Sequence, residues 1–216
     1  MRGMSTPAAL IDLVVHEMRT PITVATGSLR QVGPLNDAAQ QGAIDRALRS
    51  CARLDQLATE LRDWVRTTET PPASEPHAVS DLVRDAAARA AATRSSFPPV
   101  QIDEGPGLSA AGAPTLAEAL AALIEAVARA ADPSDAVRIS WSAGDSGARI
   151  AIRRGDRPDA DPSGAFDAEL MGGLGFALPL ARAVVEAGGG TLASRRDPQG
   201  RLDAVTVQLA AASRPR

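Results

Sequence analysis

The chain has no lysine, so all 23 of its basic residues are arginine. A Walker-type phosphate loop needs its lysine, so this class of nucleotide site is excluded. Cys51 is the one cysteine, which excludes a disulfide framework within the chain and a thiolate metal cluster. Aromatic residues make up only 2% of a chain that is 44% hydrophobic. The core must therefore be built mainly from Ala, Val, Leu and Ile, and because alanine favours helix we expect a helix-rich architecture.

Long apolar runs and strong net charge are also missing. The run AALIDLVV is interrupted by Asp12 and is far too short to cross a bilayer, and it lacks a signal-peptide cleavage pattern. A formal charge of −3 gives no reason to expect nucleic-acid binding. Two widely separated histidines do not predict a metal site. We therefore expect a cytoplasmic protein that binds neither membrane nor nucleic acid.

Residues 1–70 predict two long helices joined by a short turn. GPLND at 33–37 is the turn signal, and Asn36 or Asp37 is placed to cap the second helix. The apolar stripe of the first helix consists of Leu10, Val14, Met18, Ala25, Leu29 and Val32. The second helix has a seven-residue repeat, with Ile44, Cys51, Ala58 and Val65 in one row and Ala47, Leu54 and Leu61 in the other. Two striped helices with a short connection predict a hairpin.

A single hairpin covers its own apolar seams poorly. We therefore expect it to pair with a second copy of the chain in a homodimeric four-helix bundle. Packing of the hairpin against the rest of the same chain is the alternative.

The Pro-rich stretch 71–78 predicts a linker, and 79–216 predicts a second domain. His77 falls in this linker with no partner group nearby, and we assign it no role. Alternating segments around GDSG predict a β-hairpin. The other elements expected in this domain are helices near 80–93, 114–131 and up to 187, a strand at 100–102, and two strands at the end of the chain. Mixed helices and antiparallel strands indicate a two-layer sandwich, which makes the fold class α+β.

The stretch VVHEMRTPIT at 14–23 places a histidine, a carboxylate and a proline in the first helix. At about 100° per residue, His16 lies about 200° from Val14 and so faces solvent, with Thr20 one turn further along. Pro21 has no N–H and costs an interior helix roughly 3 kcal/mol. Because this cost falls beside an outward imidazole, it indicates function more than folding. Glu17 is placed to hold one ring nitrogen and leave the other nucleophilic.

HEMRTP resembles the H-box of sensor histidine kinases, which lies in their dimerisation and phosphotransfer hairpin. The resemblance implies that His16 accepts a phosphoryl group and passes it to an aspartate of a response-regulator receiver domain. It also implies that Glu17 is the acid/base residue and that Thr20 occupies the position used in phosphatase activity.

The same resemblance extends over the second domain, which is similar to the Bergerat-type ATPase sandwich of that family. LAEALAALIEAVARAA corresponds to the N-box helix, and GGLGFALP to the glycine-rich end of the ATP lid. Gly173 and Gly175 match the G2 pattern, in which backbone N–H groups approach phosphates at a helix start. A helix-start turn without a ligand would give the same residues, so the glycines leave both interpretations open.

Other positions depart from the family pattern. Ala126 and Ala122 stand where the N-box has asparagines, and a methyl group offers Mg²⁺ no oxygen. The adenine-binding aspartate corresponds to Arg154 or, after a two-residue shift, to Asp156, and the glycines that should follow are missing. Arginine only donates hydrogen bonds and cannot accept one from an adenine amine. ATP and Mg²⁺ are therefore doubtful cofactors, and we expect little or no autophosphorylation.

Three functions remain open from the sequence. The first is a histidine phosphotransferase or phosphatase in which His16 exchanges phosphate with receiver domains. The second is a kinase with divergent nucleotide contacts, or one phosphorylated in trans by a complete partner. The third is a binding module that sequesters a regulator without chemistry.

Overall fold

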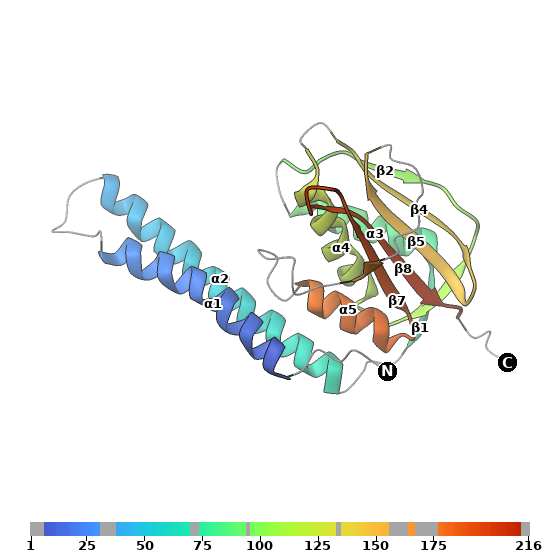
Figure 1. The fold of residues 1–216 in the computed structure, drawn as a ribbon, viewed down its shortest axis with the longest axis horizontal. Coiled ribbons are helices and arrows are strands. Elements are labelled where there is room, and N and C mark those ends of the chain that lie inside the picture. Colours follow the sequence, from blue (N-terminus) through green and yellow to red (C-terminus); the bar gives the residue numbers. More distant parts are fainter. Residues whose placement is uncertain are drawn as a thin grey trace. The chain divides into compact units, whose positions relative to one another are not determined.

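The computed structural model describes residues 7–30, 38–69, 74–93, 96–132, 135–155, 164–166 and 177–212. The chain divides into two compact units, Met1–Asp63 and Trp64–Arg216. The first contains α1 (Pro7–Arg30) and most of α2 (Ala38–Glu69), which run alongside each other in Figure 1. No described helix is both long and apolar enough to cross a membrane.

Small side chains form the buried faces of the two helices. In α1 these are Pro21, Ala25 and Ser28; in α2 they are Ala43, Ala47 and Ser50, followed by Leu57. Their spacing alternates between four and three residues, as in packed antiparallel helices. Of the two predicted rows of α2, the row of Ala47 and Leu54 lies on this face, whereas Cys51 and Ala58 of the other row are exposed. The buried face is therefore narrower than the apolar pattern alone indicates.

The second unit is a two-layer α+β sandwich, as the sequence predicts. A six-stranded sheet has the order β2-β4-β5-β8-β7-β6, and β1 pairs with β3 in a separate two-stranded sheet. Three helices pack against the large sheet (Figure 1). The helices are α3 (Val79–Ala92), α4 (Leu116–Ala130) and α5 (Ala177–Ala187). The strands are β1 (Glu75–Ala78), β2 (Val100–Asp103), β3 (Ser109–Gly112), β4 (Val137–Gly144), β5 (Gly147–Arg154), β6 (Gly164–Ala165), β7 (Thr191–Arg196) and β8 (Leu202–Ala210).

Buried and less buried residues alternate along β5, so its buried side chains lie on one face of the sheet, beneath the helices. Ala148, Ile150 and Ile152 of β5 are buried, and the residues opposite Ile150 and Ile152 in β8 are the buried Val207 and Val205. The predicted hairpin around GDSG is confirmed as β4 and β5, which pair antiparallel. The pairing of β2 with β4 is parallel, and the other pairings of the large sheet are antiparallel. The sandwich follows from this period of two, which gives one apolar face for helices to cover.

The predicted linker over 71–78 is wrong for its second half. Residues 75–78 form β1, which pairs antiparallel with β3. His77 also has partners: its Nε2 lies 3.3 Å from the carbonyl oxygen of Gly112, and its own carbonyl accepts a hydrogen bond from Ser109 Oγ. The linker prediction rested on the prolines of this stretch. Proline is tolerated in an edge strand, however, and Pro76 lies in one.

The connection between β2 and β3 offers a matched test of packing. A Cβ added at Gly105 would collide with the backbone oxygen and indole ring of Trp141, whereas nothing lies within 4 Å of a Cβ at Gly107. Trp141 is also fixed by a 2.9 Å hydrogen bond from its Nε1 to the Pro106 carbonyl. We expect Gly105→Ala to lower the melting temperature by about 2–12 °C and Gly107→Ala to leave it nearly unchanged. Equal effects in a calorimetric scan would contradict this packing.

Candidate functional site

The HEMRTP segment lies within α1. The backbone of residues 16 and 17 is helical, while the side chains of His16 and Glu17 lie outside the described part of the structure. Thr20 is exposed, and it follows residue 16 by four positions, which is one helical turn along the same face. Pro21, on the neighbouring face, is buried. The helix thus presents Thr20 away from the hairpin seam.

Two residues shortly after residue 16 change the hydrogen bonding of the α1 backbone. Pro21 lies inside α1 and donates no hydrogen bond, so the carbonyl of residue 17 loses its usual partner. Thr23 Oγ1 donates to the Arg19 carbonyl at 2.8 Å, a back-bond of the kind that bends helices. Thr23 follows Arg19 by four residues, a spacing that allows this back-bond but was not recognised from the sequence. Both residues lie beside or within the HEMRTP segment of α1.

Large apolar side chains of the hairpin face outward. Ile22 and Leu29 of α1 are 48% and 56% exposed, and Leu48 of α2 is 62% exposed. Residues 22 and 29 are one heptad apart, so they share a helix face that is distinct from the small-residue seam. Each of the two helices therefore leaves at least one large apolar side chain uncovered.

In the sandwich, α4 carries alanine at the two positions that the resemblance to histidine kinases assigns to asparagine. Ala126 is 4% exposed and Ala122 is half-buried, and neither methyl group is a ligand for a metal or a phosphate. No group of three His, Cys, Asp or Glu side chains that could hold a metal ion is found among the described residues. Gly173 and Gly175 lie outside the described residues, as does Asp156, so their predicted contacts stay predictions.

Arg154 points into the core at the end of β5. Its side chain is 1% exposed, and it donates from Nη1 to the Ala130 carbonyl at 2.6 Å and from Nη2 to Asp197 Oδ2 at 2.9 Å. Asp203 Oδ1 lies 3.7 Å from the same Nη2. Arg154, one of the two residues that the resemblance places at the adenine-acceptor position, is thus held in an internal ion pair. Neither Arg154 nor the two alanines of α4 offers an acceptor for an adenine amine or an oxygen for Mg²⁺.

No protein-family model matches the sequence, and no curated protein matches it. Solved structures do match. The Acinetobacter baumannii histidine kinase AdeS aligns with a TM-score of 0.64 at 19% identity, over 92% of this chain and 98% of that one. The chain has the histidine kinase fold. ThkA in complex with the response regulator protein TrrA gives a TM-score of 0.66 at 15% identity, over 96% of this chain and 62% of that one. Full-length ShkA in complex with AMPPNP gives 0.59 at 18% identity, over 98% of this chain and 48% of that one.

Within this histidine kinase fold, Asp197 is the most strongly perturbed acid among the described residues. Burial opposes its charged form, but hydrogen bonds from the Arg201 backbone N–H and from the Arg154 and Arg201 side chains outweigh burial and hold the pKa of Asp197 well below its usual range. The bond to Asp197 in turn raises the pKa of Arg201, against the opposing effect of burial. The carboxylate therefore stays ionised in the folded protein at all ordinary pH values.

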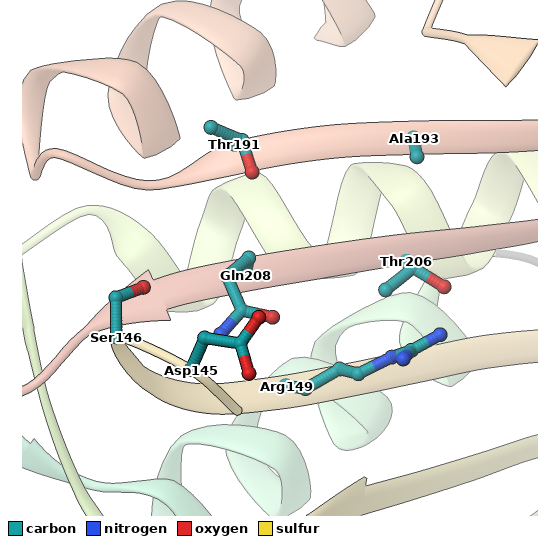
Figure 2. Close-up of a pocket in the computed structure, with 7 residues that line it drawn as sticks. All are labelled: Asp145, Ser146, Arg149, Thr191, Ala193, Thr206 and Gln208. Atoms are coloured by element: carbon teal, nitrogen blue, oxygen red, sulfur yellow. The ribbon is translucent and has the colours of Figure 1, made fainter. Parts of the chain in front are cut away.

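A separate shallow pocket lies on the sheet face opposite the helices of the histidine kinase fold, where β5, β7 and β8 run side by side (Figure 2). Its volume is about 330 Å³. The residues that line it are Asp145, Ser146, Arg149, Thr191, Ala193, Thr206 and Gln208. None of them was singled out from the sequence.

The state of Asp197 predicts a specific acid response. Because its pKa is lower in the folded than in the unfolded chain, its stabilising contribution is complete above the unfolded value of about 3.9 and is lost as pH falls through the folded value. We expect the melting temperature of the wild type to fall steeply below about pH 4. Asp197→Asn should be less stable at pH 7 and should show a flatter acid limb. Parallel curves for the two proteins would contradict the assignment.

Proposed function

We propose that the chain is a two-component phosphotransfer protein in which His16 carries a phosphoryl group exchanged with the aspartate of a response-regulator receiver domain. The observation that carries this proposal is HEMRTP in a hairpin helix, with Pro21 in the helix interior, in a chain whose fold matches histidine kinases over nearly its whole length. The complex of ThkA with the response regulator TrrA supports a receiver domain as the partner.

The transfer needs no reactant other than His16 and the phosphorylated aspartate of the receiver domain. An imidazole nitrogen of His16 forms a bond to phosphorus as the acyl phosphate bond to the receiver aspartate breaks, and the aspartate leaves as a carboxylate. Glu17 holds the other ring N–H and stabilises the charge that develops on the ring. The reverse reaction phosphorylates the receiver. Thr20, exposed one turn away, positions a water that hydrolyses the phosphoryl group in a phosphatase reaction.

In this proposal the phosphoryl group on His16 comes from another phosphoprotein and not from ATP. Loss of one charged hydrogen bond of about 1.5–3 kcal/mol at the adenine weakens binding roughly tenfold to more than a hundredfold. Ala126 and Ala122 add no oxygen for Mg²⁺, which would offset charge on the transferring phosphate. We therefore assign the chain weak or no autophosphorylation.

A homodimer is part of this proposal. The seam between α1 and α2 is made of small residues, whereas Ile22, Leu29 and Leu48 stay exposed. A second hairpin would bury these side chains, at about 1.5–3 kcal/mol each, in a four-helix bundle. Because the buried seam residues of α1 follow each other at four-residue and three-residue spacing, Ile22 and Leu29 lie beside the seam and remain available for contact with a second hairpin.

Receiver-dependent labelling tests the central residue. A receiver domain phosphorylated with a radioactive phosphoryl donor should label the wild type and not His16→Ala, because the acceptor nitrogen is lost. Thr20→Ala should be labelled normally but should lose its label more slowly in water. Equal labelling of wild type and His16→Ala would remove the proposal.

The same assay separates the two other interpretations. Labelling of His16 by ATP and Mg²⁺ alone would identify a kinase with divergent contacts. Receiver binding that is equally tight for wild type and His16→Ala, without any labelling, would identify a module that only sequesters its regulator. Arg19→Gln is a suitable control, since Arg19 is exposed in the same motif and has no assigned role in the transfer.

The exposed apolar side chains of the hairpin predict a dimer that a single charge disrupts. We expect Leu48→Glu to raise the dimer dissociation constant at least about tenfold, because the bundle would have to bury a carboxylate in place of an apolar side chain. Arg49→Glu, at the adjacent exposed position, should have a much smaller effect. Sedimentation equilibrium measures both constants. A monomeric wild type, or equal effects of the two substitutions, would contradict the proposed interface.

A further inference from the structure

A charged cluster joins three segments at one end of the large sheet. Arg154 lies at the end of β5, Asp197 lies in the turn between β7 and β8, and Ala130 ends α4. The Arg154 guanidinium contacts the latter two, with Nη1 2.6 Å from the Ala130 carbonyl and Nη2 2.9 Å from Asp197 Oδ2. Its Nε also lies 3.9 Å from Asp135, which follows α4. One side chain therefore links the helix layer to two parts of the sheet.

The hydrogen-bonding capacity of Asp197 is fully used within the protein. Oδ1 accepts from the backbone N–H groups of Gln199 at 3.0 Å and Arg201 at 2.8 Å. Oδ2 accepts from Arg154 Nη2 and from Arg201 Nε, each at 2.9 Å. A carboxylate offers about four acceptor positions. Asp197 therefore has none left for a ligand, although it is the acid closest to the Arg154 side chain.

The second acid of the cluster, Asp203, is held through Oδ2, whereas its buried Oδ1 accepts no hydrogen bond from the described residues. Asp203 Oδ2 accepts from Arg195 Nε at 2.8 Å and lies 2.7 Å from Arg195 Nη2, and its side chain is 4% exposed. Arg201, in turn, lies 3.4 Å from Asp132. Each buried charge is thus balanced by a neighbour from the same unit, as buried charges must be.

We propose that this cluster is an internal lock that makes the sandwich independent of nucleotide: Arg154 and Asp197 hold together the end of α4, the end of β5 and the β7–β8 turn in a chain that does not bind ATP. The inference rests on the proposed function in one respect, since it explains how a phosphotransfer protein keeps a kinase-type sandwich without its ligand. An adenine nucleotide entering here would meet the Arg154 guanidinium, which only donates, and the Asp197 carboxylate, whose acceptor positions are all used. It would also have to separate a buried ion pair, which leaves a charge without a partner in the core.

Nucleotide titration tests the first half of this proposal. We expect ATP with Mg²⁺, and ATP alone, to shift the melting temperature of the full chain by less than about 1 °C even at millimolar concentration, because a ligand stabilises only a folded state that it binds. AMPPNP added to a histidine kinase known to bind it serves as the positive control for the assay. A rise of several degrees, or calorimetric heats that saturate with ATP, would overturn the proposal.

A double-mutant cycle tests the lock itself. Arg154→Met and Asp197→Asn should each lower the melting temperature by about 6–20 °C, because each removes one member of a buried ion pair. The double variant should be clearly more stable than the sum of the two losses predicts. Arg182→Met and Glu186→Gln form the matched control, since this pair has a similar distance of 2.8 Å but is exposed on α5. We expect no measurable coupling there.

The outcomes separate this inference from the proposed function. Additive losses in the Arg154–Asp197 cycle, or single variants as stable as the wild type, would overturn the lock even if receiver-dependent labelling of His16 succeeds. Failure of that labelling, with a coupled cycle and no response to ATP, would instead remove the phosphotransfer role and leave the lock standing. Should the single variants fail to fold, the folded double variant would still report the coupling.

Discussion

One buried guanidinium connects the layers of the sandwich. Arg154 reaches the end of α4 and the turn between β7 and β8 from the last position of β5, and almost none of its side chain is exposed. A charge in such a position is tolerated because Asp197 and Asp203 lie beside it and because the Ala130 carbonyl accepts a further hydrogen bond from it. The apolar core beneath α4 supplies the driving force for folding. The ion cluster determines how the segments at this end of the sheet are arranged.

The two units differ in which side chains they bury. The sandwich buries large aliphatic residues on one face of its sheet and closes its charged end with internal ion pairs. The hairpin uses Pro21, Ala25 and Ala47 for its own seam and leaves Ile22 and Leu48 exposed. Small side chains allow two helices to approach closely, and large ones left outside need a further partner. The sandwich is thus self-sufficient, whereas the hairpin has an uncovered apolar surface.

The unusual backbone of α1 also has a place in this scheme. Pro21 contributes its ring to the buried seam while its missing N–H falls on the carbonyl of residue 17. Thr23 adds a second disturbance by bonding to the Arg19 carbonyl. Packing alone would be served by alanine at position 21 at lower cost to the helix. The presence of Pro21 in the interior of α1 is therefore better explained by the chemistry proposed for His16 than by the stability of the helix.

The sequence by itself determined the α+β class, the long helices, the hairpin around GDSG and the position of HEMRTP on a helix, because these depend on local periodicity and turn residues. Through the family resemblance it also placed Arg154 or Asp156 at the adenine-acceptor position, and a guanidinium there could only donate. Only the tertiary structure decided what Arg154 does, because Ala130 and Asp197 are distant in sequence and meet it only when the sheet forms. The same reason applies to β1, whose strand character comes from pairing with β3 and not from EPHA, and to the one-residue offset that leaves Cys51 outside the hairpin seam.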